Sequence, residues 1–142
     1  MPETPGYACG MAHHPRLYTF PLPWSLTLYS AFDTHWTQRA RADRIARQQA
    51  RDTLRRLAPT LTVPPGHVVD VEFVFIPPGR RALNAVRLSE HVAMLRCGFA
   101  DALGCEVWHF YPVHRVSKVP TPNGEVLVRL SVVPIKGFRE DR

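Results

Sequence analysis

The chain has few cysteines, and no two of them stand close together. Cys9, Cys97 and Cys105 are its only cysteines, and they form no Cys-x-x-Cys pair. This spacing argues against a disulfide framework and against a zinc finger, and it favours a reducing cytoplasm. We expect Cys97 and Cys105 to be small buried side chains rather than nucleophiles.

Long apolar runs are also missing from the sequence. No run reaches the roughly 20 apolar residues that a membrane-spanning helix needs, and the chain does not start with the basic-then-apolar pattern of a signal peptide. We therefore expect no membrane partner. Hydrophobic residues still make up 45% of the 142 residues, which favours one folded domain with one core over a disordered chain.

Acidic residues are the minority among the charged side chains. The chain carries 18 lysines and arginines against 12 aspartates and glutamates, which gives a formal net charge of +6. This excess favours an acidic partner, either nucleic acid or the acidic face of a protein. Many small basic proteins bind no anion, so the net charge alone leaves the partner open.

The stretch Val68–Leu103 organises the sequence as a strand, a tight turn and a helix. Val68–Ile76 is rich in β-branched and aromatic residues, which predicts a strand. Pro77–Gly79 then ends the strand and turns the chain. From about Leu83 the apolar residues follow helical spacing on two neighbouring faces, which predicts a largely buried helix that ends before Gly104.

Arginines stand in this turn, beside the predicted helix start. Arg80 and Arg81 lie where main-chain N–H groups also point outward, so an anion is the expected ligand. Arg115 and Lys118 add positive charge later in the chain and belong to the same expected binding set.

A second helix is predicted over Thr37–Leu57, with Asp33 or Thr34 as its N-cap. Arginines recur on it at steps of three and four residues, which places them in one stripe. The stripe consists of Arg44, Arg47, Arg51 and Arg55. Two interpretations stay open: a surface that follows phosphates or an acidic protein, and an ordinary solvated helix face.

Further strands complete the expected fold. They are placed at Leu17–Leu22, at Leu26–Phe32, at Glu106–Tyr111 with a continuation over Val113–Val119, and at Glu125–Val133 after an Asn-Gly turn. Trp24 is expected in the core, and the apolar residues around Trp108 predict burial on both faces of their strand. The sequence thus predicts a single α+β domain over residues 17–135, with element order β-β-α-β-α-β-β and both helices on one face of a mixed sheet. Residues 1–16 are expected to form a flexible arm, and residues 136–142 a charged tail.

Four segments carry a resemblance to the RusA family of Holliday-junction resolvases. Tyr18–Trp24 is similar to the opening strand of that family and its Leu-Pro-Trp-Pro turn, and Thr34–Thr37 falls at its first helix. Arg80–Val86 falls on the family motif Arg-Asp-Leu-Asp-Asn-Leu, and Cys97–Phe99 on a Gly-Phe step. The resemblance covers most of the chain, from about Tyr18 to Ile135, and it implies the same α+β fold.

The chain departs from the family at the residues that carry its chemistry. Ala82 and Asn84 stand in place of the two motif aspartates, Ala85 replaces the asparagine and Leu88 replaces a lysine, while Asp101 lies near the place of a third acid. The family's reaction is metal-assisted hydrolysis of phosphodiesters, and Mg²⁺ requires carboxylate oxygens. The resemblance therefore implies a scaffold without catalytic residues, metal or cofactor.

Two more carboxylates bear on this conclusion. Asp70 and Glu72 share one face of the central strand and, with Asp101, are the acids that a substitute metal site would use. Asp70 and Glu72 lie well before the turn, so we expect these two residues to face solvent or to pair with arginines instead.

Two functions follow from the residues and the resemblance. The first is a non-catalytic binding protein, encoded by a phage, that regulates or inhibits a host nucleic-acid machine in the host cytoplasm. The expected partner is an acidic surface of bacterial RNA polymerase or of its sigma factor. The alternative is a RusA-like DNA-binding protein or a metal-dependent Holliday-junction resolvase. Because RusA-type resolvases act as dimers, the resemblance also implies a homodimer.

Overall fold

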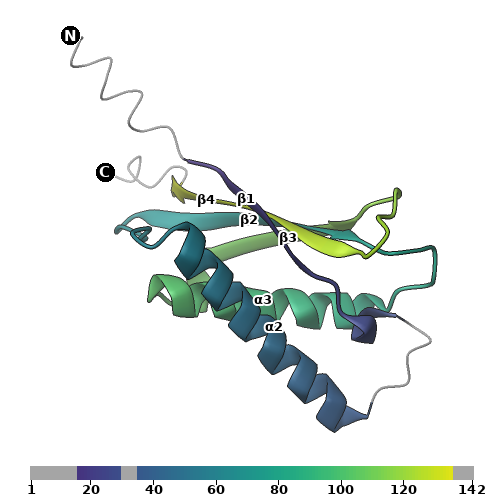
Figure 1. Ribbon diagram of the computed structural model, residues 1–142. Helices are drawn as coiled ribbons and strands as arrows, with labels where there is room; N and C mark the ends of the chain where they lie inside the picture. Colours follow the sequence, from purple (N-terminus) through teal and green to yellow (C-terminus); the bar gives the residue numbers. More distant parts are fainter. Residues whose placement is uncertain (1–15, 30–34, 136–142) are drawn as a thin grey trace.

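The computed structural model describes residues 16–29 and 35–135, which fold as one α+β domain (Figure 1). Its elements are β1 (Tyr18–Pro23), the 3₁₀ turn η1 (Leu26–Leu28), α2 (Trp36–Leu57), β2 (His67–Ile76), α3 (Ala85–Leu103), the 3₁₀ turn η2 (Val107–His109), β3 (Phe110–Val116) and β4 (Glu125–Pro134). The sheet has the order β1-β4-β2-β3, in which β3 runs parallel to β2 and the other neighbours are antiparallel. Both helices lie on one side of it, so the predicted fold class is confirmed (Figure 1).

The predicted arm and tail lie outside the described residues, apart from Arg16. No helix in the described part of the chain has the length and hydropathy to cross a membrane.

The core lies between the sheet and α3. Alternate residues of β2 and β4 face the helices, and Phe73 and Val128 form one of the paired positions. The ring of Phe99 from α3 stacks on Phe73 with a centroid distance of 6.1 Å. As predicted, Trp24 packs against this core, with its ring 6.4 Å from that of Phe75. Alternation along the two central strands therefore decides which side of the sheet the helices cover.

The stretch Leu26–Phe32 does not form the predicted strand. Leu26–Leu28 is a 3₁₀ turn, in which Ser25 caps the first amide groups by accepting a hydrogen bond from the Thr27 amide. Tyr29 makes only an isolated bridge, and the following residues lie outside the described part of the chain. The apolar residues of this stretch are buried by packing around a turn, which periodicity alone does not distinguish from a strand.

The strand predicted from Glu106 begins later than expected. Val107–His109 forms a 3₁₀ turn, and β3 continues through Pro112 without a break. The prediction of burial on both faces is wrong: Phe110 is buried, but Trp108 is largely exposed. The reason is that both helices cover the same side of the sheet, so the other face of β3 has no layer packed on it, and Trp108 lies in the η2 turn before the strand (Figure 1).

The helix ends are close to the predicted ones. The N-cap of α2 is His35, whose Nδ1 accepts from the Thr37 amide, rather than the predicted Asp33 or Thr34, which lie outside the described residues. Helix α3 begins at Ala85, slightly after the predicted Leu83, and it ends at Gly104 in the left-handed conformation as predicted. The two described cysteines, Cys97 and Cys105, are half-buried rather than fully buried.

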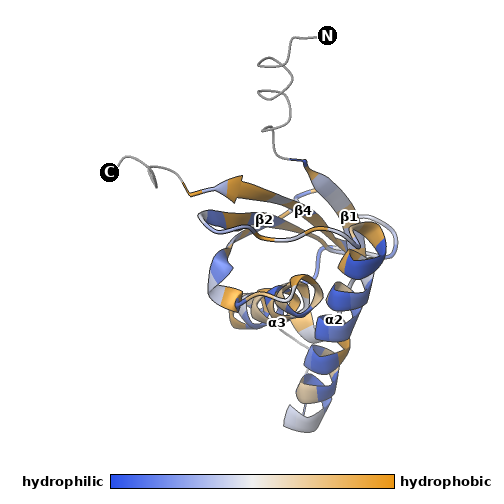
Figure 2. Cartoon of the chain, turned by 90° about the vertical axis from the view of Figure 1, so that its left-hand side faces the viewer, coloured by the Kyte–Doolittle hydropathy of each residue, from blue (hydrophilic) through white to orange (hydrophobic). Residues whose placement is uncertain are grey.

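Helices α2 and α3 approach closely through small residues. The buried face of α2 consists of Ala46, Ala50 and Leu54, and the rest of the helix is mainly hydrophilic (Figure 2). Opposite this face stands Gly98 of α3. A Cβ atom there would lie 2.8 Å from that of Ala50 and would collide with the carbonyl oxygen of Arg47. The glycine of the Gly-Phe step is therefore needed for helix packing.

We expect the substitution Gly98→Ala to lower the free energy of unfolding, measured by urea denaturation, by about 1–3 kcal/mol or more, because the new methyl group meets backbone that cannot move aside. Gly79→Ala is the matched control, since a Cβ at Gly79 would meet no atom within 4 Å. Equal unfolding midpoints for the two variants would contradict this account of the contact.

Candidate anion-binding surface at the turn between β2 and α3

The turn between β2 and α3 is fixed by the segment that follows β1. Tyr29 forms an antiparallel bridge with Leu83, and the Asn84 amide donates a 2.8 Å hydrogen bond to the Leu28 carbonyl oxygen. The guanidinium of Arg81 lies over the Tyr29 ring, 4.0 Å from its centroid. At the other end of the turn, the Thr121 amide donates a 3.1 Å hydrogen bond to the Pro77 carbonyl oxygen. A backbone held at both ends in this way presents its side chains in a defined arrangement.

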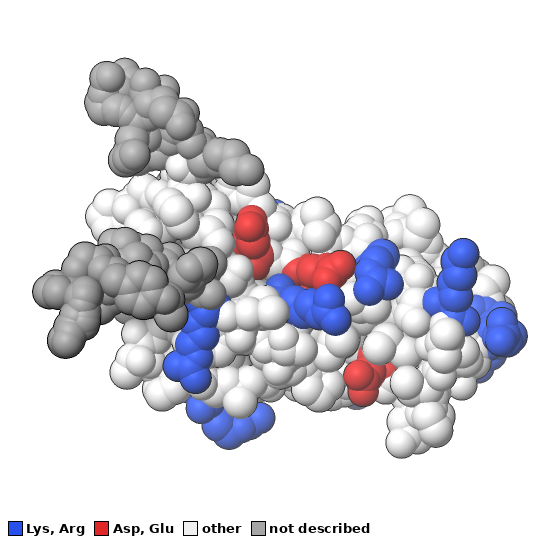
Figure 3. Space-filling view, turned by 90° about the horizontal axis from the view of Figure 1, so that it is seen from above, with Lys and Arg blue, Asp and Glu red and all other residues white. Residues whose placement is uncertain are grey.

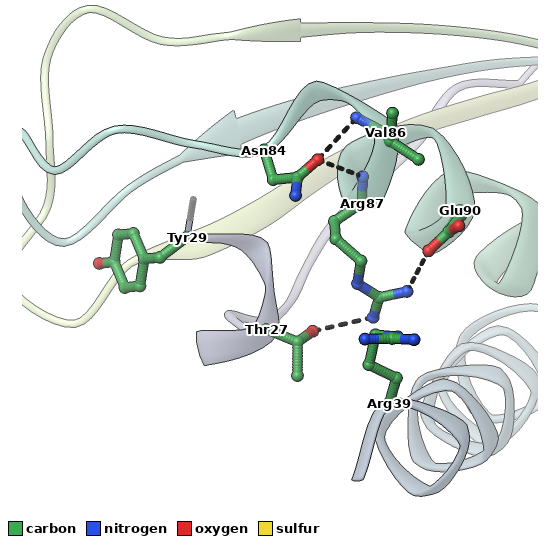
Figure 4. Close-up of a pocket in the computed structure, with 7 residues that line it drawn as sticks. All are labelled: Thr27, Tyr29, Arg39, Asn84, Val86, Arg87 and Glu90. Atoms are coloured by element: carbon green, nitrogen blue, oxygen red, sulfur yellow. Dashed lines mark hydrogen bonds and ion pairs between the residues drawn. The ribbon is translucent and has the colours of Figure 1, made fainter. Parts of the chain in front are cut away.

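Asn84 serves as the N-cap of α3. Its side-chain oxygen accepts hydrogen bonds from the amides of Val86 at 3.0 Å and Arg87 at 3.1 Å (Figure 4). By its place in the motif Asn84 is only a poor metal ligand, but an asparagine directly before a helical pattern is also a typical cap. With this oxygen occupied, and with only a methyl group on Ala82, the two motif positions offer no carboxylate to a cation.

Asp101, which lies near the place of the third acid, forms an ion pair with α2. The carboxylate of Asp101 accepts two hydrogen bonds from Arg47, from Nε at 2.7 Å and from Nη2 at 2.9 Å. This hydrogen bonding is the main reason why the pKa of Asp101 lies below its ordinary value. Asp101 therefore ties α3 to α2 as an ion pair.

Asp70 and Glu72 do not join Asp101. They belong to the face of β2 that is turned away from the helices, where the Glu72 carboxylate lies 3.3 Å from Arg115 and 3.6 Å from Arg129. The predicted arginine-paired role of Glu72 is confirmed, and Asp70 is exposed. Within the described ranges, no group of three or more His, Cys, Asp or Glu side chains is arranged to hold a metal ion.

The arginine stripe of α2 lies mostly against the far end of α3. Arg47 and Arg55 both reach Asp101, the latter through its backbone oxygen at 3.4 Å, and Arg51 pairs with Asp52. Arg44 is exposed. At a rise of about 1.5 Å per residue, Asp101 is about 25 Å along the helix from the turn. The arginines predicted to act together are thus divided between two regions.

Basic residues gather at the turn itself. Arg80, Arg81 and Lys118 line a hollow of about 260 Å³, and no acidic residue takes part in its lining. Figure 3 shows basic side chains at one end of the molecule, whereas acidic and basic groups alternate over the exposed face of the sheet. Arg115 belongs to that mixed face because it pairs with Glu72. This hollow is the strongest candidate for an anion site.

A buried arginine, which the sequence analysis missed, supports the start of α3. Arg87 is 6% exposed, and it donates hydrogen bonds to Thr27 at 3.0 Å and to Glu90 (Figure 4). It also donates to Asp43 of α2 at 3.1 Å. Burial by itself lowers the pKa of Arg87, but the hydrogen bonds with Glu90 and Asp43 outweigh it and raise the pKa. The spacing of Arg87 and Glu90 on one helix is visible in the sequence, but Thr27 and Asp43 come from other elements, so no local pattern marks Arg87 as buried.

His91 lies one turn further along the same helix. It is 3% exposed, and its ring packs edge-on against Phe75. Burial, partly offset by the charge of Asp43, lowers the pKa of His91 to about 4. The imidazole is therefore neutral at pH 7.

Two substitutions at Asn84 separate its capping role from its size. Asn84→Ala is expected to lower the free energy of unfolding by about 1 kcal/mol, because two amide groups at the start of α3 lose their acceptor. Asn84→Asp is expected to retain the wild-type value or exceed it, since a carboxylate caps equally well and suits the helix dipole. Urea denaturation checks both, and equal losses for the two variants would show that capping is not the role of this side chain.

His91 is expected to make the fold sensitive to mild acid. Its pKa in the folded state, about 4, lies below its ordinary value of 6.5, so the unfolded chain binds the proton more tightly. The free energy of unfolding should fall as the pH drops from about 6.5 to about 4, by up to about 3 kcal/mol. Denaturation curves of His91→Leu should lack this part of the slope, whereas the exposed-site control His114→Leu should keep it. An unchanged slope in His91→Leu would refute the assignment.

Comparison with known proteins adds one relative. No protein-family model matches the chain. It is similar to an uncharacterized protein of Xylella fastidiosa, with 29% identity over 129 residues, which cover 89% of this chain and 84% of that relative.

Proposed function

We propose that this protein is a non-catalytic, RusA-like binding protein that holds an acidic surface of a host nucleic-acid machine, with bacterial RNA polymerase as the specific candidate. One observation carries the proposal. The turn on which the resembled nucleases keep their aspartates has a methyl group at Ala82 and a capping amide at Asn84. In the same turn Arg80 and Arg81 join Lys118 around a hollow without acids.

The electrostatics favour a partner with clustered carboxylates. Arg80, Arg81 and Lys118 are exposed, so each ion pair with a partner contributes at most about 1 kcal/mol. Their larger effect is on the rate of association, because a cluster of one sign attracts the opposite surface before contact. Binding should therefore weaken with ionic strength through the association rate. The choice of a polymerase in the host cytoplasm follows from the resemblance to phage nucleases.

Binding of nucleic acid is the second candidate, and the arginines of α2 favour it. Arg41, Arg44 and Arg56 are exposed along one helix and form a second basic region apart from the turn. If the protein neutralises phosphates, log affinity should fall with log salt by about 0.9 for each phosphate on duplex DNA. The two candidates thus differ in which arginines matter.

We expect the triple variant Arg80→Gln, Arg81→Gln, Lys118→Gln to bind purified RNA polymerase about tenfold more weakly or worse, a loss of about 1.4 kcal/mol. The charge-matched control is Arg41→Gln, Arg44→Gln, Arg56→Gln on α2, which should retain binding. Biolayer interferometry with the polymerase core and with the sigma factor, at low and at physiological salt, measures both.

The opposite outcome separates the candidates. Binding of duplex or four-way-junction DNA without any binding of polymerase, lost in the α2 variant, would establish the nucleic-acid function instead. Cleavage of a four-way junction with Mg²⁺ or Mn²⁺ that disappears in Asp101→Asn would show that the protein is a nuclease. Both results would contradict the proposal.

A further inference from the structure

The two edges of the sheet differ in how well they are protected. β1 forms one edge and contains Pro21 and Pro23, which cannot donate a backbone hydrogen bond to an added strand. β3 forms the other edge and contains a single proline, Pro112. Edge strands are templates for pairing with another chain unless something blocks them. β3 is therefore the edge at which an added strand would meet the least hindrance.

The free backbone groups of β3 follow from its pairing with β2. The Ser117 amide donates a 2.8 Å hydrogen bond to the Phe75 carbonyl oxygen, and the groups of successive residues in a strand alternate in direction. Odd-numbered residues of β3 therefore face β2, and even-numbered residues turn outward. Pro112 points outward, where its missing N–H costs no ladder bond, and His114 and Val116 each present both an N–H and a C=O. No loop, helix or side chain in the described part of the chain hydrogen-bonds these groups.

Apolar side chains are exposed along this edge. Tyr111 is 58% exposed, Val113 62% and Val116 41%, and Trp108 and Val119 at the two ends are 66% and 73% exposed. Tyr111 and Val113 share one face of the strand and Val116 lies on the other. Natural proteins usually protect such an edge with charges or prolines, so exposed apolar side chains beside unpaired backbone groups favour a surface that another chain covers.

The charges around the edge select the kind of partner. Arg115 lies on β3, and Lys118, Arg80 and Arg81 line the hollow that Val116 also lines. Of the acids beside the edge, Glu72 is already shared by Arg115 and Arg129, and Asp70 stands beside Tyr111 at the end of β3 away from the hollow. An acidic chain would meet the basic groups of the hollow favourably, and an extended polypeptide can pair with the free N–H and C=O groups of the edge.

We propose that β3 receives an extended, acidic segment of a partner protein as a fifth strand of the sheet. This inference rests on the proposed function and specifies how the acidic partner is held. Main-chain hydrogen bonds to His114 and Val116 supply affinity, and side chains that pack on Tyr111 and Val113 supply selectivity. Carboxylates of the segment reach the basic hollow at the end of the strand.

Two substitutions at one position isolate the backbone contribution. His114→Pro removes an outward N–H without removing a ladder bond to β2, as Pro112 already does two residues earlier. His114→Thr removes the same imidazole but keeps the N–H. The probe is a displayed library of short random peptides, selected first on the wild-type chain. We expect enriched peptides to alternate β-branched or aromatic residues with Asp or Glu, to bind His114→Thr like the wild type, and to bind His114→Pro at least about tenfold more weakly.

Hydrogen exchange on the wild-type protein tests the same contact without any substitution. A bound peptide should slow the exchange of the outward amides of His114 and Val116, and it should leave those of Val113 and Arg115, which are already bonded to β2, nearly unchanged. Equal effects on both sets would overturn the proposal.

Other results would also overturn strand addition at β3, and they allow the proposed function to be judged separately. No enriched peptide, basic peptides, or equal binding by both His114 variants would reject strand addition. If RNA polymerase binding in those cases is still lost in the Arg80, Arg81 and Lys118 variant, the proposed function stands alone. A dimer in sedimentation that His114→Pro dissociates would show that a second copy occupies the edge, and tight DNA binding lost in His114→Pro would show that nucleic acid does.

Discussion

The close approach of α2 and α3 at Gly98 is the constraint on which the other features depend. Helix α2 buries only Ala46, Ala50 and Leu54, so its hydrophobic contribution is small for a helix of 22 residues. Close contact between backbones compensates, because it brings many atoms to van der Waals distance at once. This contact fixes α2 to α3, and α3, which packs on the sheet through Phe99, in turn places the loop that follows β2.

The same packing explains where the charged residues go. Arg47 supplies the backbone that Gly98 contacts, and its side chain reaches Asp101 on the next turn of α3. At the opposite end of the helix pair, Arg87 of α3 forms an ion pair with Asp43 of α2. Ion pairs therefore bracket the apolar contact on both sides. The ion pair with Arg47 engages Asp101 far from the turn, and the hollow at the turn is itself lined by arginines and a lysine without a carboxylate.

The basic hollow and the open edge of the sheet form one continuous surface. Val116 and Lys118 belong to the hollow, and Val116 is also the last residue of β3. An extended chain that pairs with β3 would therefore run directly into the arginines of the turn. This arrangement joins a non-directional attraction, which gathers acidic partners, to directional backbone hydrogen bonds, which select among them.

Local patterns in the sequence determined the two central strands, the two-faced helix α3 and its cap at Gly104, because each pattern records which side of an element is apolar. The tertiary structure alone decided that Leu26–Leu28 forms a turn, that Trp108 is exposed and that Asp101 belongs to Arg47. Those outcomes depend on which neighbour an element acquires, and partners distant in sequence leave no periodic trace. The family resemblance located Asn84, but only the fold showed that its oxygen is occupied by the helix it starts.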